Sequence, residues 1–171
     1  MIVSAMNDVL QRLFTSDPSE ALTTILTLAI AFVVALPVGW DRERENRTAG
    51  LRTFPLVSAA SAAFILVGRE SLGPRGDMHA YIVQGVMTGL GFLGAGVIIR
   101  SGDDRVRGTA TAISLWSTAA MGAAIAYGRL EIALVLVAID LIGLRLMRPV
   151  KKVIKAEIRE APRESPEPVG P

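Results

Sequence analysis

The stretch Asp41–Thr53, DRERENRTAGLRT, lies between two long runs without charge and decides how the rest of the chain can fold. The flanking runs, residues 21–40 and 53–68, contain no Asp, Glu, Lys or Arg. Apolar runs of this length favour helices with lipid on their outer faces. A short loop with four arginines between two such spans is retained on the cytoplasmic side. The stretch therefore predicts a membrane hairpin that turns at the inner surface.

Three further apolar blocks continue the pattern. They cover residues 78–99, 108–128 and 132–147, and only the last is interrupted, by Asp140 and Arg145. We therefore predict an all-α integral membrane protein with five transmembrane helices, at about residues 20–40, 53–68, 78–99, 109–128 and 131–147. Residues 1–16 are expected to lie at the outer surface, and residues 17–149 to form the transmembrane domain. Residues 150–171 are expected to form a basic amphipathic segment and a disordered Pro-rich tail.

The distribution of basic residues predicts the orientation. With these spans, 14 of the 18 Lys and Arg residues fall on one side, the side of the Arg-rich loop. Cytoplasmic loops carry such an excess, so we expect the N-terminus outside and the C-terminus inside. The protein would then be a multi-pass membrane protein.

Composition argues against several classes of function. Cysteine is absent and His79 is the single histidine, so thiolate sites and multi-histidine metal sites within one chain are excluded. A P-loop, a hydrolase elbow and a plausible acid–base pair are all missing, and we do not expect an enzyme. No cofactor is identified and no nucleic-acid partner is expected.

The third span is rich in glycine. Its glycines are Gly85, Gly89, Gly91, Gly94 and Gly96. The run formally contains GxGxxG, but it lacks the preceding strand and βαβ context of a dinucleotide site. Gly85 and Gly89 form a GxxxG pair, which favours close packing of helices. The alternative is a broken helix whose freed carbonyl groups coordinate a cation.

The Arg-rich loop has an echo later in the chain. The pattern R-x4-R-x2-G-x2-T occurs twice with a constant offset of 58, at Arg42, Arg47, Gly50 and Thr53, and at Arg100, Arg105, Gly108 and Thr111. Both copies fall at a predicted cytoplasmic turn. The first four spans would therefore be two parallel-repeat helical hairpins, related by an axis along the membrane normal.

The two loops predict a cytoplasmic anion or partner site. Two helix N-termini beside several arginines suit a lipid head group, a phosphate or the carboxylates of a partner. The candidate residues are Asp41, Arg42, Arg47, Gly50, Arg52, Thr53, Arg100, Arg105, Arg107, Gly108 and Thr111. The alternative is that the carboxylates of these loops neutralise neighbouring arginines and stiffen the turns.

Asp140 is the single acidic residue inside an apolar block. An intramembrane charge is by default a functional candidate, so Asp140, with Gln84, is a candidate metal site for Mg²⁺. The alternative is that Asp140 pairs with Arg145 or with a polar group of a neighbouring helix.

Several of these motifs together resemble the MgtC/SapB family of bacterial inner-membrane proteins. They are Gly39–Arg42 (GWDR), Arg47–Thr53 (RTAGLRT), Gly89–Ile98 (GLGFLGAGVI), Val106–Gly108 (VRG) and Ala119–Gly122 (AAMG). The resemblance implies five spans, an inside C-terminus and a link to growth in low magnesium and, in pathogens, to survival in phagocytes. This chain has Asp41 where the family usually has Glu, and we expect a short form of the family without the soluble C-terminal domain of longer members.

Two functions follow as hypotheses. The first is a regulator or adaptor of another membrane complex, such as the ATP synthase, in adaptation to low magnesium. The second is a Mg²⁺ transporter or channel that uses Asp140 and the Gly-rich third span. In either case the small-residue helices predict a homodimer, and the basic face predicts contact with anionic lipids of the bilayer.

Overall fold

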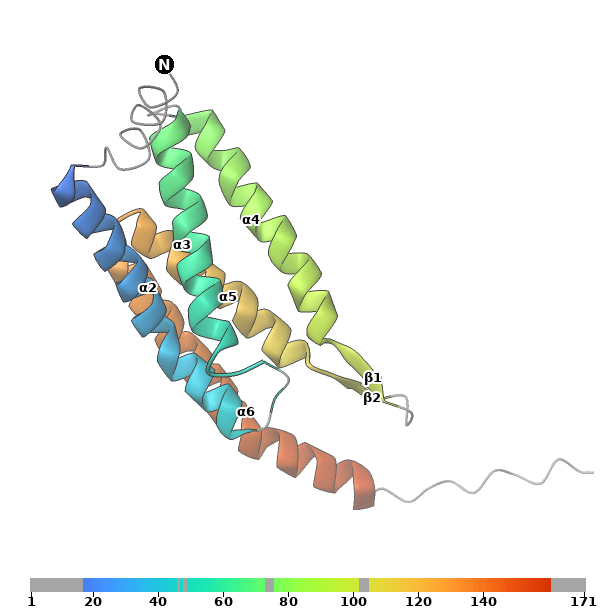
Figure 1. Cartoon of the computed structure of the whole chain (residues 1–171). Helices are drawn as coiled ribbons and strands as arrows, with labels where there is room; N and C mark the ends of the chain where they lie inside the picture. The colour runs from blue at the N-terminus through green and yellow to red at the C-terminus, as the bar shows by residue number, and fades with distance from the viewer. Residues whose placement is uncertain (1–16, 46, 48, 73–75, 102–104, 161–171) are drawn as a thin grey trace, which may run out of the picture.

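The computed structural model describes residues 17–45, 47, 49–72, 76–101 and 105–160 (Figure 1). Within these residues the chain forms five helices and one two-stranded hairpin. The elements are α2 (Pro18–Arg44), α3 (Thr53–Leu72), α4 (Gly76–Val97), β1 (Ile99–Ser101), β2 (Arg105–Arg107), α5 (Thr109–Ala126) and α6 (Leu130–Glu160).

The predicted all-helical architecture is confirmed for the described residues, and each predicted span contains a helix. Three of the helices are long and apolar enough to cross a membrane: α2, α4 over His79–Val97, and α5. Helix α4 runs from Gly76 to Val97 without a break, so the broken helix considered for this span is not formed.

Two features differ from the expectation. The second loop, expected only to turn like the first, forms an antiparallel strand pair in which Ile99 is opposite Arg107 and Ser101 is opposite Arg105. The last helix continues past Pro149 to Glu160, so the segment after residue 150 extends the final helix instead of starting a new element. The expected outer segment 1–16 and the tail 161–171 lie outside the described residues.

Helix α5 is the centre of the bundle. It packs against each of α2, α3, α4 and α6. Its sequence, TATAISLWSTAAMGAAIA, has no charge and many small side chains, which lets other helices approach on several faces. Its buried hydroxyls bond within the helix: Ser114 Oγ donates to Ala110 O at 3.0 Å, and Thr118 Oγ1 to Ser114 O at 2.7 Å. These polar residues can therefore be buried without partners from another helix.

The closest helix contact is between α3 and α5. A Cβ added to Gly122 on α5 would collide with the backbone of Ser58 on α3. Both residues are buried, and the clash involves backbone, which cannot rotate away. Glycine at position 122 is therefore what allows the crossing of the two helices.

We predict that Gly122→Ala destabilises the bundle, because it inserts a methyl group where α3 leaves no room. Overpacking of this kind costs about 1–3 kcal/mol. The measurement is the fraction of detergent-solubilised protein that stays monodisperse in size-exclusion chromatography after heating.

The control is Gly91→Ala, since a Cβ at Gly91 meets nothing within 4 Å. It should be as stable as the unmodified chain or slightly more so, because alanine favours helix. Equal stability of the two variants would contradict the packing at Gly122.

Candidate functional site

The first and second loops lie at the same end of the bundle, here called the loop end (Figure 1). In both loops the glycine of the repeated pattern starts the next helix. The Gly50 carbonyl accepts from Phe54 N at 3.2 Å, and the Gly108 carbonyl accepts from Ala112 N at 2.9 Å. The glycine carbonyl thus accepts a hydrogen bond from the first turn of the next helix in both copies, although α3 begins three residues after Gly50 and α5 one residue after Gly108.

Glycine is required at both positions for different reasons. Gly108 has a φ of 95°, in the left-handed region, and a side chain there would also collide with the Val97 carbonyl. A side chain at Gly50 would collide with the carboxylate of Glu43. That carboxylate accepts a hydrogen bond from Leu51 N at 3.0 Å, which ties the first loop to the end of α2.

A buried ion-pair cluster lies at the loop end of α2. Arg42 is 2% exposed and Asp41 is 4% exposed. Arg42 Nη2 is 2.8 Å from Asp41 Oδ2 and 3.3 Å from Glu45 Oε2. A buried guanidinium is tolerated only when carboxylates compensate it, and here two carboxylates share one nitrogen.

Two more arginines reach this cluster from its edges. Arg145 on α6 places Nε 3.1 Å from Asp41 Oδ1. Arg47 in the first loop places Nε 3.1 Å from Glu45 Oε2. Their side chains are 58% and 48% exposed, so each guanidinium remains largely accessible while it binds a carboxylate. The cluster therefore joins α2, the first loop and α6.

Asp140 lies deeper on α6 and faces the same cluster. Its carboxylate accepts a hydrogen bond from Ser117 on α5 and is in the electrostatic field of Arg42. Two partners were considered for Asp140, namely Arg145 and a polar group of a neighbouring helix. The structure shows the second, Ser117, because Arg145 contacts Asp41 instead. Among the described residues, Asp140 Oδ2 and Arg42 Nε are both buried without a hydrogen-bond partner.

The other residues of the predicted anion site differ in burial where they are described. Arg52, Thr53 and Arg107 are exposed, and Thr111 is buried in α5. The side chains of Arg100 and Arg105 lie outside the described part of the structure. Arg42 and Arg47 pair with nearby carboxylates, as in the alternative considered for these loops.

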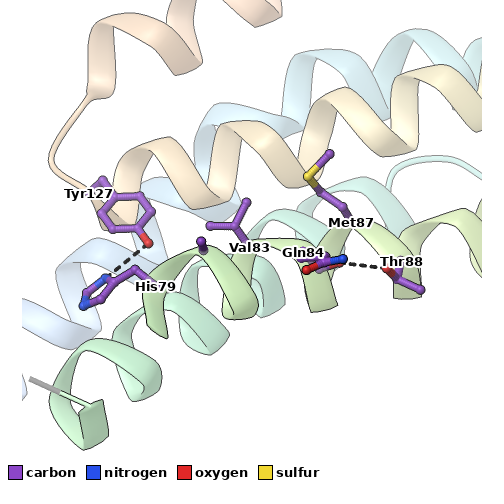
Figure 2. Close-up of a pocket in the computed structure, with 7 residues that line it drawn as sticks. His79, Val83, Gln84, Met87, Thr88 and Tyr127 are labelled. Carbon is purple, nitrogen blue, oxygen red and sulfur yellow. Dashed lines mark hydrogen bonds between the residues drawn. The ribbon is translucent and has the colours of Figure 1, made fainter. Parts of the chain in front are cut away.

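The structure separates the two residues of the predicted metal site. Gln84 is on α4 and lines a cavity of about 570 Å³, together with His79 and Tyr127, toward the end opposite the loop end (Figure 2). Asp140 instead contacts α5. Within the described residues, no three His, Asp or Glu side chains come together as metal ligands. In the same cavity the Tyr127 hydroxyl is 3.4 Å from His79 Nδ1.

Three glycines of α4, Gly85, Gly89 and Gly96, share one side of the helix, and the rest of the described chain leaves that side open next to them. A Cβ at Gly85, Gly89, Gly91 or Gly96 would meet nothing within 4 Å. Only Gly94 has a neighbour, since its Cβ would lie 3.7 Å from Ala112 Cβ. Gly85 and Gly89 also line an apolar groove of about 440 Å³ between α3 and α4. The close packing predicted for these glycines is therefore largely absent within a single chain.

An all-helical bundle with uncharged spans and a buried charged cluster defines a helical membrane protein. Residues 28–153 match the profile of the MgtC family, and the chain belongs to that family. This confirms the resemblance inferred from the motifs. No solved structure is similar to this one.

Three relatives illustrate the likeness. Protein SrpB of Synechococcus elongatus is 40% identical over 119 residues, which cover 63% of this chain and 65% of SrpB. Protein MgtC of Salmonella typhimurium is 39% identical over 124 residues, 72% of this chain and 52% of that protein. Protein MgtC of Brucella abortus is 34% identical over 132 residues, 77% of this chain and 54% of that protein. The chain thus spans about half the length of the MgtC relatives and two thirds of SrpB.

Three residues of the cluster were missed as site residues in the sequence. Arg145 was considered only as a partner of Asp140, Glu45 only among the loop carboxylates that neutralise arginines, and Ser117 not at all. The signal for Arg145 was present, because an arginine inside an apolar block needs a partner. No sequence signal identifies Ser117, since hydroxyls are common along α5.

We predict that Arg42→Met strongly destabilises the protein. It leaves the carboxylates of Asp41 and Glu45 without their shared buried cation, and the loss of one partner from a buried pair costs about 3–5 kcal/mol. Survival of monodisperse protein after heating in detergent is the measurement.

Arg47→Gln is the matched control, because it removes an exposed partner of the same Glu45. Exposed ion pairs contribute about 0–1 kcal/mol, so this variant should resemble the unmodified chain. If Arg42→Met were equally tolerated, the cluster would not hold α2 in place.

Proposed function

We propose that this protein is a membrane-embedded regulator or adaptor in magnesium homeostasis and adaptation to low magnesium. In this proposal it crosses a bacterial inner membrane five times, with the N-terminus outside and the C-terminus inside. The family supports the link to magnesium, and the distribution of basic residues supports the orientation. It acts by binding another membrane complex and changing that complex's activity, without carrying out chemistry itself.

The uncovered glycine face of α4 is the observation that carries this proposal. A Cβ added at Gly85, Gly89 or Gly96, which share one side of the helix, would meet nothing within 4 Å. Glycine in a membrane helix is used where another helix approaches closely, since the gain comes from van der Waals contact between backbones. A face of this kind, left open by its own bundle, fits a transmembrane helix of a partner.

The buried ion-pair cluster supports the same conclusion. Asp41 binds both Arg42 and Arg145, so these residues hold helix ends together rather than offering ligands to a passing ion. Mg²⁺ requires several oxygen ligands in octahedral geometry and is repelled by a neighbouring guanidinium. The cluster is therefore better suited to fixing the bundle that presents α4.

Other partners in the proposal are the bilayer itself and a second copy of the chain. The basic residues of the C-terminal segment favour contact with anionic lipid heads. The small-residue faces favour a homodimer, the commonest closed assembly. A rotary ATP synthase is one candidate for the regulated complex, on the strength of the family resemblance.

A Mg²⁺ transporter or channel is the second candidate function. The observation that favours it is Asp140, a carboxylate inside an apolar helix with one oxygen lacking a partner among the described residues. Proteoliposomes that contain the purified chain test it directly. Flux of Mg²⁺ that Asp140→Asn abolishes would establish transport, and absence of flux would exclude it.

We predict that Gly89→Leu releases the partner. A leucine side chain on the open face prevents close approach of a second helix, so recovery of the partner should fall about tenfold, a loss of about 1.4 kcal/mol. The measurement is quantitative mass spectrometry of proteins that co-purify from native membranes after mild cross-linking.

The control is Gly143→Leu on α6, where a Cβ also meets nothing within 4 Å. This variant makes the same change at an equally open position on another helix and should retain the partner. Equal recovery with Gly89→Leu, or no partner with the unmodified chain, would contradict the adaptor function.

A further inference from the structure

We propose that the hollow between α4 and α5 binds one uncharged, quinone-like lipid. Its ring would lie at the end opposite the loop end, and its hydrocarbon tail would run along the two helices toward the loop end. A quinone is defined here by its chemistry, which is a planar ring with carbonyl acceptors, no charge and a single tail. This inference does not depend on the regulatory function proposed above, because it concerns a ligand of the isolated chain.

The hollow follows from two facing stripes of side chains. Residues at three- and four-residue spacing share one face of a helix, and the stripe of α4 consists of His79, Val83, Met87 and Leu90. The facing stripe of α5 consists of Trp116, Ala119, Ala120, Ala123 and Tyr127. Between its two aromatic residues α5 presents only methyl groups on this side. The alanines therefore leave a space that larger side chains would fill.

The hollow has two adjoining parts. The first is the cavity of about 570 Å³ in Figure 2, and the second is a cavity of about 330 Å³ between α3, α4 and α5. Both parts are lined by Val83, Met87 and Tyr127, so one leads into the other. Small-molecule sites enclose about 300–1,000 Å³. From His79 to Leu90 the helix rises about 16 Å, which gives a long and narrow space for one ring and one chain.

Polar side chains gather in the first part of the hollow. The Tyr127 hydroxyl is 3.4 Å from His79 Nδ1, and the two ring centroids are 6.2 Å apart with planes tilted by 36°. Gln84 lies further along α4 in the same cavity (Figure 2). Hydroxyl and amide groups can donate to carbonyl oxygens, and aromatic rings pack against a planar ring. This part suits the head of the ligand.

The second part suits the tail. Apart from Tyr127 and the indole of Trp116, it is lined by aliphatic side chains and Met87. Lipid chains outside the bundle are equally apolar, so a tail gains little from the hydrophobic effect on entering. It gains van der Waals contact instead, because an unfilled space deprives its lining atoms of neighbours.

Charge complementarity favours an uncharged head over a phosphate. Among the described residues, neither part of the hollow is lined by Asp, Glu, Lys or Arg. The arginines nearest to Tyr127 in the structure are engaged elsewhere, since Arg129 binds Glu131 and Arg69 donates to the Ala126 carbonyl at 2.7 Å. A phosphate in the hollow would therefore lack a compensating cation, whereas carbonyl groups need only hydrogen-bond donors.

Tryptophan fluorescence of the purified full chain in phosphatidylcholine nanodiscs tests the proposal, with decylubiquinone as the probe. The chain has two tryptophans, and Trp40→Phe leaves Trp116, which lines the second part, as the single reporter. Quinones quench indole fluorescence on close approach, so quenching of Trp116 should saturate as the site fills. Trp116→Phe leaves Trp40 on α2, outside the hollow, where quenching should rise in proportion to the quinone in the bilayer without saturating.

Three variants in the Trp40→Phe background probe the two parts separately. Tyr127→Phe and Gln84→Leu each remove a donor from the head end and should weaken binding about tenfold. Ala120→Leu fills the tail end and should abolish saturation. Tyr81→Phe is the matched control, because it removes the same hydroxyl from a tyrosine of α4 that is exposed outside the hollow, and it should bind as before. Elution of each variant in size-exclusion chromatography checks its fold.

Three results would overturn the proposal. The first is the same quenching curve for Trp116 and Trp40, which would show partition into the bilayer only. The second is saturable quenching that Tyr127→Phe, Gln84→Leu and Ala120→Leu all leave unchanged in correctly folded protein. The third is displacement of the quinone by an equal mole fraction of phosphatidylglycerol, which would assign the hollow to a charged phospholipid.

Discussion

The burial of Arg42 is the constraint on which the loop end of the bundle depends. Arg42 is the largest fully buried side chain among the described residues, and it carries a charge that cannot be left unpaired in an apolar medium. Its neighbours therefore have to supply carboxylates. Asp41 supplies one carboxylate from the same helix, α2, and Glu45 supplies another from the position directly after the end of α2. Arg145 on α6 in turn binds the second oxygen of Asp41. The helix ends are fixed relative to one another as a result.

The helices could be predicted from the sequence because the physical requirement is simple. Backbone groups in lipid must be bonded within the segment, and long uncharged runs reveal where such segments lie. The pairing of charges could not be predicted in the same way. Asp41 binds Arg145, which is 104 residues distant in the chain, although other arginines are much nearer in sequence. Only the packing of α2 beside α6 decides between such partners.

The repeated pattern shows what a sequence repeat does and does not determine. In both copies the glycine carbonyl accepts a hydrogen bond from the first turn of the next helix, so the pattern indicates that a helix follows within a few residues. The loops themselves differ. In the first loop the Glu43 carboxylate accepts a hydrogen bond from Leu51 N. The second loop is flanked by two short strands that pair with each other. The interactions that shape each loop lie in residues that the repeat does not share.

The glycines of α4 illustrate a different limit of sequence reasoning. Their pattern indicates a surface for close helix contact but not the identity of the helix that makes it. In the described chain α4 packs chiefly on α3 and α5 at the edge of the bundle, and most of its glycines have no neighbour. A small-residue face is thus informative about a function only after the structure shows that the chain does not use the face itself.

The buried cluster and the glycine face are connected through α5. On one side Ser117 binds Asp140 of α6, and on the other Ala112 is the residue nearest to Gly94 of α4. Because Ser117 and Ala112 lie five positions apart on a rigid helix, a shift of α5 relative to α6 also changes the contact with α4. Gly122 holds α5 tightly against α3, which leaves α5 little freedom except to move together with α3. The hydrogen bond at Ser117 and the contact at Ala112 therefore lie on one helix, which also packs tightly on α3.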